Sequence, residues 1–237
     1  MRRVLAAALT LTALLASGCS GVDAEKAQAL LDQSTQAMAN VKSVSFAMRM
    51  WTSGGPEGTD VVVLMHGGGY NKGKHKGDSI VTITGLPGVG DLSVATRGGH
   101  AYVRAGGRWT SMPMPAGAGS SSALAGFDLA AYVTQVRVEE GVMVEGQLMS
   151  RITGTIDTAA ALKGMFASLG AVSGGALPDV FDSFDDTRAV LYVSETTHLP
   201  MRTLVDMPVK LAGEKITLHM DIVITAVDEP VALPSPG

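Results

Sequence analysis

The chain contains a single cysteine, Cys19, which follows an apolar run near the N-terminus. One thiol cannot form an intramolecular disulfide, and it cannot supply a multi-cysteine zinc or iron–sulfur site. Three roles remain for Cys19: burial in a core, nucleophilic attack, or covalent modification of its sulfur. The small residues Ala16, Ser17 and Gly18 stand directly before it, as small residues do before a processing site, and this favours modification.

Residues 1–18 have the organisation of a secretory signal peptide. Arg2 and Arg3 form a positive n-region, and residues 4–16 form a short apolar h-region. The apolar run is shorter than the roughly 20 residues that a membrane-spanning helix needs. We therefore expect residues 1–18 to be removed.

The sequence ASGC resembles a bacterial lipobox, although Ala16 stands where that motif most often has leucine. The resemblance implies that a diacylglyceryl group on Cys19 anchors the mature chain to the cytoplasmic membrane. The folded part would then lie on the extracytoplasmic face. Ordinary secretion with an unmodified Cys19 is the alternative.

A phosphate-binding loop is the next candidate for chemistry. The segment GGYNKGKH, residues 68–75, matches G-x-x-x-x-G-K and follows the strand pattern VVVLMH. However, His75 stands where a Ser or Thr should bind Mg²⁺, and a second strand pattern follows where a helix N-terminus should hold the phosphates. We expect a glycine-rich hairpin tip. The tip is locally basic, with Lys72, Lys74, His75 and the adjoining Lys76, and it either is solvated or contacts lipid headgroups or another anionic partner.

Metal binding and catalysis lack a signature in this chain. The histidines show no HExxH motif and no close pair at ligand spacing: they are His66, His75, His100, His198 and His219. The aspartates of DVFDSFDD lack the glycine and the final glutamate of a calcium loop. No G-x-S-x-G elbow presents a serine, and a hydrolase would require a clustered nucleophile and base that the sequence does not display. We expect no metal, no cofactor and no enzymatic activity.

The charge of the mature chain argues against nucleic acid as the main partner. Removal of residues 1–18 takes away two arginines and no acidic residue, so the net charge of −4 becomes −6. The remaining length suits one domain with a large core. The segment MPMPAGAGSSSALAG, residues 112–126, is expected to be a surface loop, and residues 19–237 are expected to form a single domain.

Apolar periodicity predicts an initial helix followed mainly by strands. Residues 23–40 have apolar residues at helical spacing, and from Val41 the period changes to two. The first strand places Val44, Phe46, Met48 and Met50 on one face. Further strands are predicted over residues 59–66, 79–84, 91–96, 100–104, 108–112, 147–156, 187–194, 200–207 and 214–227. Further helices are predicted over residues 128–135 and from Asp157 or Thr158 to Gly170.

Glycine-bearing turns such as RGGH and AGGR join neighbouring strands, and such short turns require antiparallel pairing. The order of elements, together with the segments DLSVATRGGHAYVRAGGRWTSMP, ITGTIDTAAAL and VLYVSETTHLPMRTLVDM, resembles the mycobacterial lipid-carrier lipoproteins of the LppX and LprG group, whose fold is LolA-like. The resemblance covers most of residues 20–230. It implies an α+β fold: a strongly curved antiparallel β-sheet, a half-barrel, with helices covering the concave face around an apolar cavity.

A Met-rich cavity is physically reasonable for this chain. It has 13 Met but only 5 Phe, 4 Tyr and 2 Trp, and flexible thioethers can repack around variable guests as well as fill an ordinary core. The residues expected to line a lipid cavity are Phe46, Met48, Met50, Leu64, Leu148, Ile152, Met165, Phe166, Leu169, Met220 and Ile222. A one-residue error in strand register would reverse this assignment.

The leading interpretation is a non-catalytic, membrane-anchored lipoprotein that binds or carries a lipid or lipoglycan across the cell envelope. The alternative is a sensor or scaffold lipoprotein of the same fold, whose core is filled and whose partner is another envelope protein. The alternative predicts a sizeable exposed apolar patch.

Overall fold

The structure is a computed structural model that describes residues 23–54, 61–86, 88, 90–112, 132–157, 187–211 and 214–234. The predicted signal peptide and Cys19 lie outside the described residues. So do residues 113–126 of the predicted surface loop and most of the helix predicted from Asp157 or Thr158 to Gly170.

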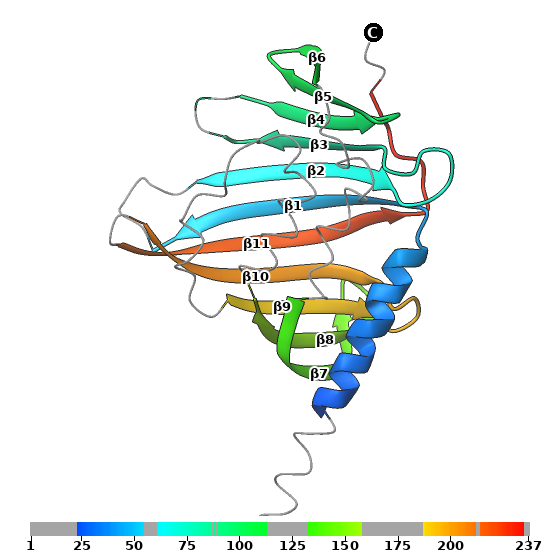
Figure 1. Ribbon diagram of the computed structural model, residues 1–237. Coiled ribbons are helices and arrows are strands. Elements are labelled where there is room, and N and C mark those ends of the chain that lie inside the picture. The colour runs from blue at the N-terminus through cyan, green and yellow to red at the C-terminus, as the bar shows by residue number, and fades with distance from the viewer. Residues whose placement is uncertain are drawn as a thin grey trace, which may run out of the picture.

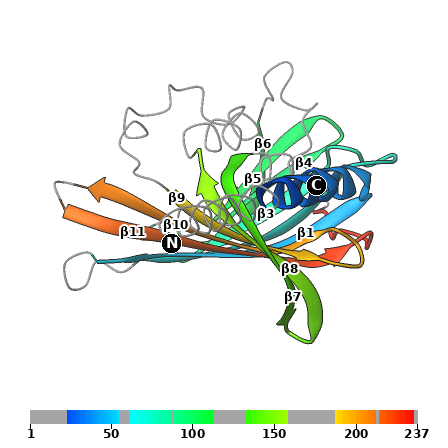
Figure 2. The same ribbon diagram turned by 90° about the horizontal axis from the view of Figure 1, so that it is seen from below.

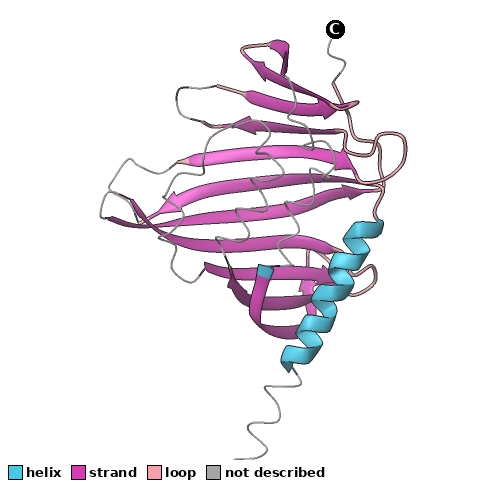
Figure 3. Cartoon of the chain, viewed as in Figure 1, coloured by secondary structure: helices cyan, strands magenta, loops and turns pink. Residues whose placement is uncertain are grey.

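The described chain begins with the predicted helix, residues 23–40 (Figure 3). Its buried stripe recurs at helical spacing and consists of Ala27, Leu31, Ser34 and Met38. The apolar members of this stripe belong to the main core together with side chains of the sheet. The N-terminal helix therefore packs on one face of the sheet, which we call the inner face; the opposite face is the outer face.

The strands form one antiparallel sheet (Figure 1). Their bounds are β1 (Ser43–Ser53), β2 (Val62–Tyr70), β3 (Ser79–Thr84), β4 (Leu92–Arg97), β5 (His100–Ala105), β6 (Arg108–Met112), β7 (Val133–Val144), β8 (Gln147–Ile156), β9 (Thr187–Ser194), β10 (Pro200–Leu211) and β11 (Glu214–Val227). The strand order is β6-β5-β4-β3-β2-β1-β11-β10-β9-β8-β7.

Pairing of β1 with β11 joins the two halves of the sheet, and β6 and β7 form its edges. Seen from below, the sheet curves around the side on which the helix lies (Figure 2). The predicted antiparallel sheet is confirmed as a large, open, curved one. Coverage of its inner face by further helices stays a prediction.

Strand β2 continues beyond its predicted end at His66 and includes Gly67, Gly68 and Gly69. Of these, Gly68 and Gly69 were expected to belong to the hairpin tip. Instead, all three glycines lie where the neighbouring strands approach closely, because a Cβ on Gly67 would stand 2.2 Å from the carbonyl oxygen of Ile80, and one on Gly68 would stand 2.6 Å from that of Val44. Glycine inside a strand often marks such an approach.

The helix predicted over residues 128–135 is wrong over residues 133–135, which begin β7. Val133 and Thr134 are β-branched, and both pair with β8. The pairing register then shifts, and Gln135 adopts a φ of 51° within this irregularity. Such a bulge breaks the alternation by which a strand is recognised.

The predicted hairpin connection between β2 and β3 is confirmed over residues 71–78, whereas residues 68–70 of GGYNKGKH belong to β2; β3 follows, and not a helix. Asp78, which is buried, holds the connection in place. Its carboxylate accepts the backbone N–H of Gly98 at 2.8 Å and contacts Nδ1 of His75 at 3.0 Å. The connection also contacts the end of the N-terminal helix, where Asn71 donates to the carbonyl oxygen of Met38.

The chain after β11 crosses the ends of β1 to β4. Asp228 accepts the N–H of Lys42 at 2.6 Å, the hydroxyl of Tyr70 accepts the N–H of Val231 at 2.8 Å, and Arg97 donates to the carbonyl oxygen of Pro234 at 2.6 Å. These contacts fix the C-terminal segment to the N-terminal half of the sheet (Figure 1). Within the described residues, no helix has both the length and the apolarity needed to cross a membrane.

Candidate functional site

The inner face carries a continuous row of mainly apolar side chains across the sheet. Successive cross-strand partners from β4 to β7 are Leu92, Ile83, Met65, Met48, Ile222, Thr203, Leu191, Ile152 and Val138. Thr203 supplies the one hydroxyl in this row. Such a row is an apolar surface that must be covered by protein or by another apolar molecule.

The two halves of the inner face differ in how well they are covered. In the C-terminal half, Ile152 is 0% exposed, Leu191 1% and Val193 0%. On β2 to β5, Val63 and Ala101 are buried, but six other apolar inner residues are half-buried: Met65, Val81, Ile83, Leu92, Val94 and Val103. The helix and the C-terminal strands thus form a closed core, and the inner face of β2 to β5 keeps apolar surface in contact with solvent.

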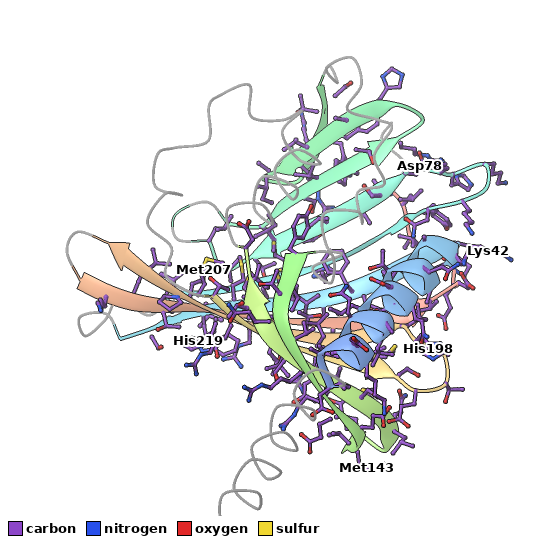
Figure 4. The ribbon with its side chains drawn as sticks, turned by 60° about the horizontal axis from the view of Figure 1, so that its bottom comes forward. Lys42, Asp78, Met143, His198, Met207 and His219 are labelled. Atoms are coloured by element: carbon purple, nitrogen blue, oxygen red, sulfur yellow. The ribbon has the colours of Figure 1, made fainter. Side chains whose placement is uncertain are left out.

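Methionines are concentrated where these two halves meet. Met48 pairs with Met65, and Met50 pairs with Met220. Met207 lies further along β10 on the same face (Figure 4). Unbranched thioether side chains can change rotamer and fill spaces of different shape, so this part of the face can adapt to a guest.

Most of the described residues predicted to line a cavity share the inner face. Phe46, Met48, Ile152, Met220 and Ile222 are buried in the main core, and Met50 packs against it. Their contact with a lipid stays a prediction. Met165, Phe166 and Leu169 lie outside the described residues.

Leu64 and Leu148 do not lie with these residues. Leu64 pairs with Arg49 on the outer face and is 47% exposed, because the register places its neighbour Met65 opposite Met48. Leu148 alternates with the inner residue Ile152 along β8 but is 49% exposed at the end of the β7–β8 hairpin, where it pairs with Met143. The expected place of Leu64 on the inner face is therefore wrong, and Leu148 lies outside the buried core.

The outer face holds a hydrogen-bonded chain that sequence reasoning missed. Ser53 Oγ lies 2.7 Å from Nε2 of His219, and Nδ1 of His219 lies 2.6 Å from Oδ1 of Asp206. With the Asp206 carboxylate as acceptor, Nδ1 carries the proton and Nε2 accepts from the serine hydroxyl. This is the order of groups in Ser–His–Asp hydrolases.

Two features weaken a catalytic role for this chain of groups. The side chain of Asp206 is 61% exposed, so water screens the charge that would stabilise an imidazolium. Ser53 is the last residue of β1 and pairs with Thr217, whereas the serine of a nucleophile elbow sits on a sharp strand-to-helix turn. The geometry accounts for a polar link among β1, β11 and β10.

Aromatic and ionic contacts extend this polar link across the outer face. Trp51 stacks on His219 with ring centroids 5.0 Å apart, and the Arg49 guanidinium lies 5.1 Å from the Trp51 ring. Arg202 donates to both carboxylate oxygens of Asp221, at 2.9 and 2.7 Å, and this hydrogen bonding raises the pKa of Arg202. The central outer face is therefore mostly polar.

The described residues hold no group of three or more His, Cys, Asp or Glu side chains placed to bind a metal ion. His75 and His219 contact single carboxylates. His66 and His100 are exposed on β2 and β5. The chemistry that the described residues support best is apolar binding on the inner face.

No protein-family model matches this chain, and no curated protein matches it. Solved structures do. LprF from Mycobacterium bovis aligns with 90% of this chain and 97% of its own, with a TM-score of 0.57 and 17% sequence identity. The lipoprotein LppX from Mycobacterium tuberculosis aligns with 89% of this chain and 99% of its own, with a TM-score of 0.43 and 16% identity. The similarity to LprF confirms the resemblance to the mycobacterial lipoproteins for the fold.

Proposed function

We propose that this protein is a membrane-anchored lipoprotein of the bacterial cell envelope that binds the acyl chains of a lipid or lipoglycan on the inner face of its sheet. Three features support the proposal. The segment ending at Cys19 resembles a lipobox, the fold is similar to that of LprF, and the inner face is apolar and rich in methionine.

The observation that carries the proposal is the half-buried inner face of β2 to β5. Its side chains are mainly apolar, and several of them, Ile83 and Val94 included, keep surface in contact with solvent. Covering such surface with an acyl chain is favourable by about 0.8 kcal/mol for each buried methylene. A protein with no guest would gain by filling this surface with its own side chains.

Two adjacent residues of β2 give a matched test. Met65 faces inward and is half-buried, and Leu64 faces outward and is 47% exposed. We expect Met65→Glu to weaken binding of a phospholipid with a pyrene-labelled acyl chain by at least about tenfold, because the carboxylate would be buried against hydrocarbon. Leu64→Glu should bind the probe as wild type does.

The variant Ile83→Glu provides a second test of the inner face in case Met65→Glu does not fold. Ile83 is the cross-strand partner of Met65 and lies farther from the buried core. Circular dichroism and thermal unfolding identify variants that fold. Equal binding of the probe by wild type, Met65→Glu and Ile83→Glu, all folded, would contradict binding on the inner face.

A second candidate function is a scaffold or sensor that binds an envelope protein. The exposed apolar residues Val62 and Leu64, on the outer face of β2, favour it. Under this function the Leu64→Glu variant would lose its protein partner and the Met65→Glu variant would retain it. The same pair of variants therefore separates the two functions.

A further inference from the structure

The hairpin of β7 and β8 ends in an exposed apolar pair, Met143 and Leu148. Their exposed fractions are 64% and 49%, and they are direct cross-strand partners. The turn between these strands is Glu145–Gly146, and both residues have positive φ, at 51° and 81°, as in a type I′ turn. Apolar side chains stabilise a fold by being buried, so large ones that remain exposed beside such a turn add nothing to folding stability.

The hairpin is held firmly at its base. Glu195, in the turn after β9, accepts the backbone N–H of Gly141 at 2.8 Å and the hydroxyl of Ser150 at 3.2 Å. Arg151 and Glu139 form an ion pair across the two strands. The apolar pair is therefore displayed on a braced projection, at the end of the molecule labelled by Met143 in Figure 4.

The same hairpin contacts the first turn of the N-terminal helix. Nζ of Lys26 lies 2.5 Å from Oε2 of Glu140. Met143 follows Glu140 by three strand residues, a rise of about 10 Å. The start of the helix and the edge strand β7 lie together at the lower end of the molecule (Figure 1).

This end is also where the proposed tether meets the folded chain. Cys19 precedes Asp23, the first described residue, by four positions, which span at most about 14 Å. A bilayer that holds the acyl chains of Cys19 therefore lies within reach of the hairpin tip. The far end of the N-terminal helix is about 27 Å from its start, since each residue rises about 1.5 Å.

Charge near the tip permits approach to a bilayer. Glu139 and Glu140 are paired with Arg151 and Lys26, and Glu145 lies 3.9 Å from Nη1 of Arg202. Arg151 and Lys26 thus offset two of the three acidic groups of the hairpin, and Arg202, which also pairs with Asp221, offsets Glu145 in part. Attraction to the membrane must come from the apolar side chains rather than from net positive charge.

We propose that Met143 and Leu148 insert into the interface of the bilayer that carries the lipid anchor, as a second point of membrane contact. This inference rests on the proposed lipidation of Cys19. A single point of attachment leaves the orientation of the protein free. A second contact fixes the β7 edge of the sheet toward the membrane.

Tryptophan fluorescence in vesicles tests the inference. The lipidated full chain, with Trp51→Phe and Trp109→Phe, is reconstituted in phosphatidylcholine–phosphatidylglycerol vesicles whose acyl chains are brominated. Met143→Trp in this background should show quenched and blue-shifted emission. Leu64→Trp is the matched control, because Leu64 is exposed to nearly the same extent as Leu148 but lies on the outer face of β2, and its emission should be unaffected.

Vesicle flotation separates the two ways in which the inference can fail. If the protein floats with the vesicles and Met143→Trp is quenched no more than Leu64→Trp, the second contact is wrong and the anchor stands. If the protein does not float, the anchor itself is wrong and the inference falls with it. Binding of the pyrene-labelled phospholipid by Met65→Glu and Leu64→Glu tests the proposed function independently of the quenching and flotation results.

Discussion

Neighbouring residues of one strand show how little separates the two faces of this protein. Leu64 and Met65 are both apolar and adjacent, yet Met65 pairs with Met48 in the apolar row of the inner face and Leu64 pairs with the exposed Arg49. A shift of one residue would exchange them. At this scale the proposed binding surface depends on register more than on residue type.

Ser53 provides a residue-scale prediction about catalysis. We expect no covalent adduct when the folded protein is treated with a fluorophosphonate probe, because the exposed carboxylate of Asp206 holds and polarises the imidazole of His219 only weakly. Intact-protein mass spectrometry measures the adduct. Stoichiometric addition at Ser53 that is lost in His219→Ala would show an activated serine and would contradict the predicted absence of enzymatic activity.

The residues of this polar link could not be found from the sequence. Ser53 and His219 are 166 positions apart, and only the pairing of β1 with β11 brings them together. By contrast, the inward placement of Phe46, Met48, Met220 and Ile222 follows from strict alternation in the first and last strands. Leu64 was misplaced because VVVLM is apolar at every position, so alternation does not identify its inner face.

The strands show the same division between what alternation reveals and what it cannot. Strand β11 was predicted with its observed bounds, since apolar and polar residues alternate from Ile216 to Ile222. The start of β7 was read as a helix, because a bulge at Gln135 interrupts the alternation. The end of β2 was missed because glycine has no side chain to show which face it occupies.

The glycines of β2 give an element-scale prediction. Gly67→Ala should destabilise the fold by about 3 kcal/mol, because its Cβ would stand 2.2 Å from the carbonyl oxygen of Ile80 and would force β2 and β3 apart. Urea unfolding measures the change. Gly73→Asn is the control: Gly73 has open space around its Cβ position and a φ of 83°, which asparagine tolerates, so the loss should be below about 1 kcal/mol. Equal losses would show that close strand approach at Gly67 is unimportant.

The whole molecule is asymmetric about the pairing of β1 with β11. The C-terminal half and the N-terminal helix form a closed core, and the N-terminal half keeps half-buried apolar residues on its inner face. The proposed tether and the Met143–Leu148 hairpin tip lie at one end, by the start of the helix. The connection between β2 and β3, which Asp78 holds in place, and the end of the helix lie at the other end of the molecule. This arrangement would present one end of the proposed lipid-binding protein to a membrane.

Cys19→Ala tests the tether at the scale of the whole molecule. We expect this variant to move from the membrane fraction to the soluble fraction, because two apolar residues of the hairpin tip cannot hold the protein without acyl chains. Immunoblotting of fractionated cells measures the distribution, with Ser20→Ala as the control. A Cys19→Ala variant that fractionates with membranes as wild type does would contradict anchoring through Cys19.

Native mass spectrometry of the domain without its anchor, residues 20–237, tests the central claim most directly. The account predicts that protein purified from bacterial cells carries a mass adduct of one or more lipids, which organic extraction removes and which Ile83→Glu greatly reduces. Only the mass of the bare chain, both as purified and after incubation with phospholipid, would contradict the binding of acyl chains on the inner face.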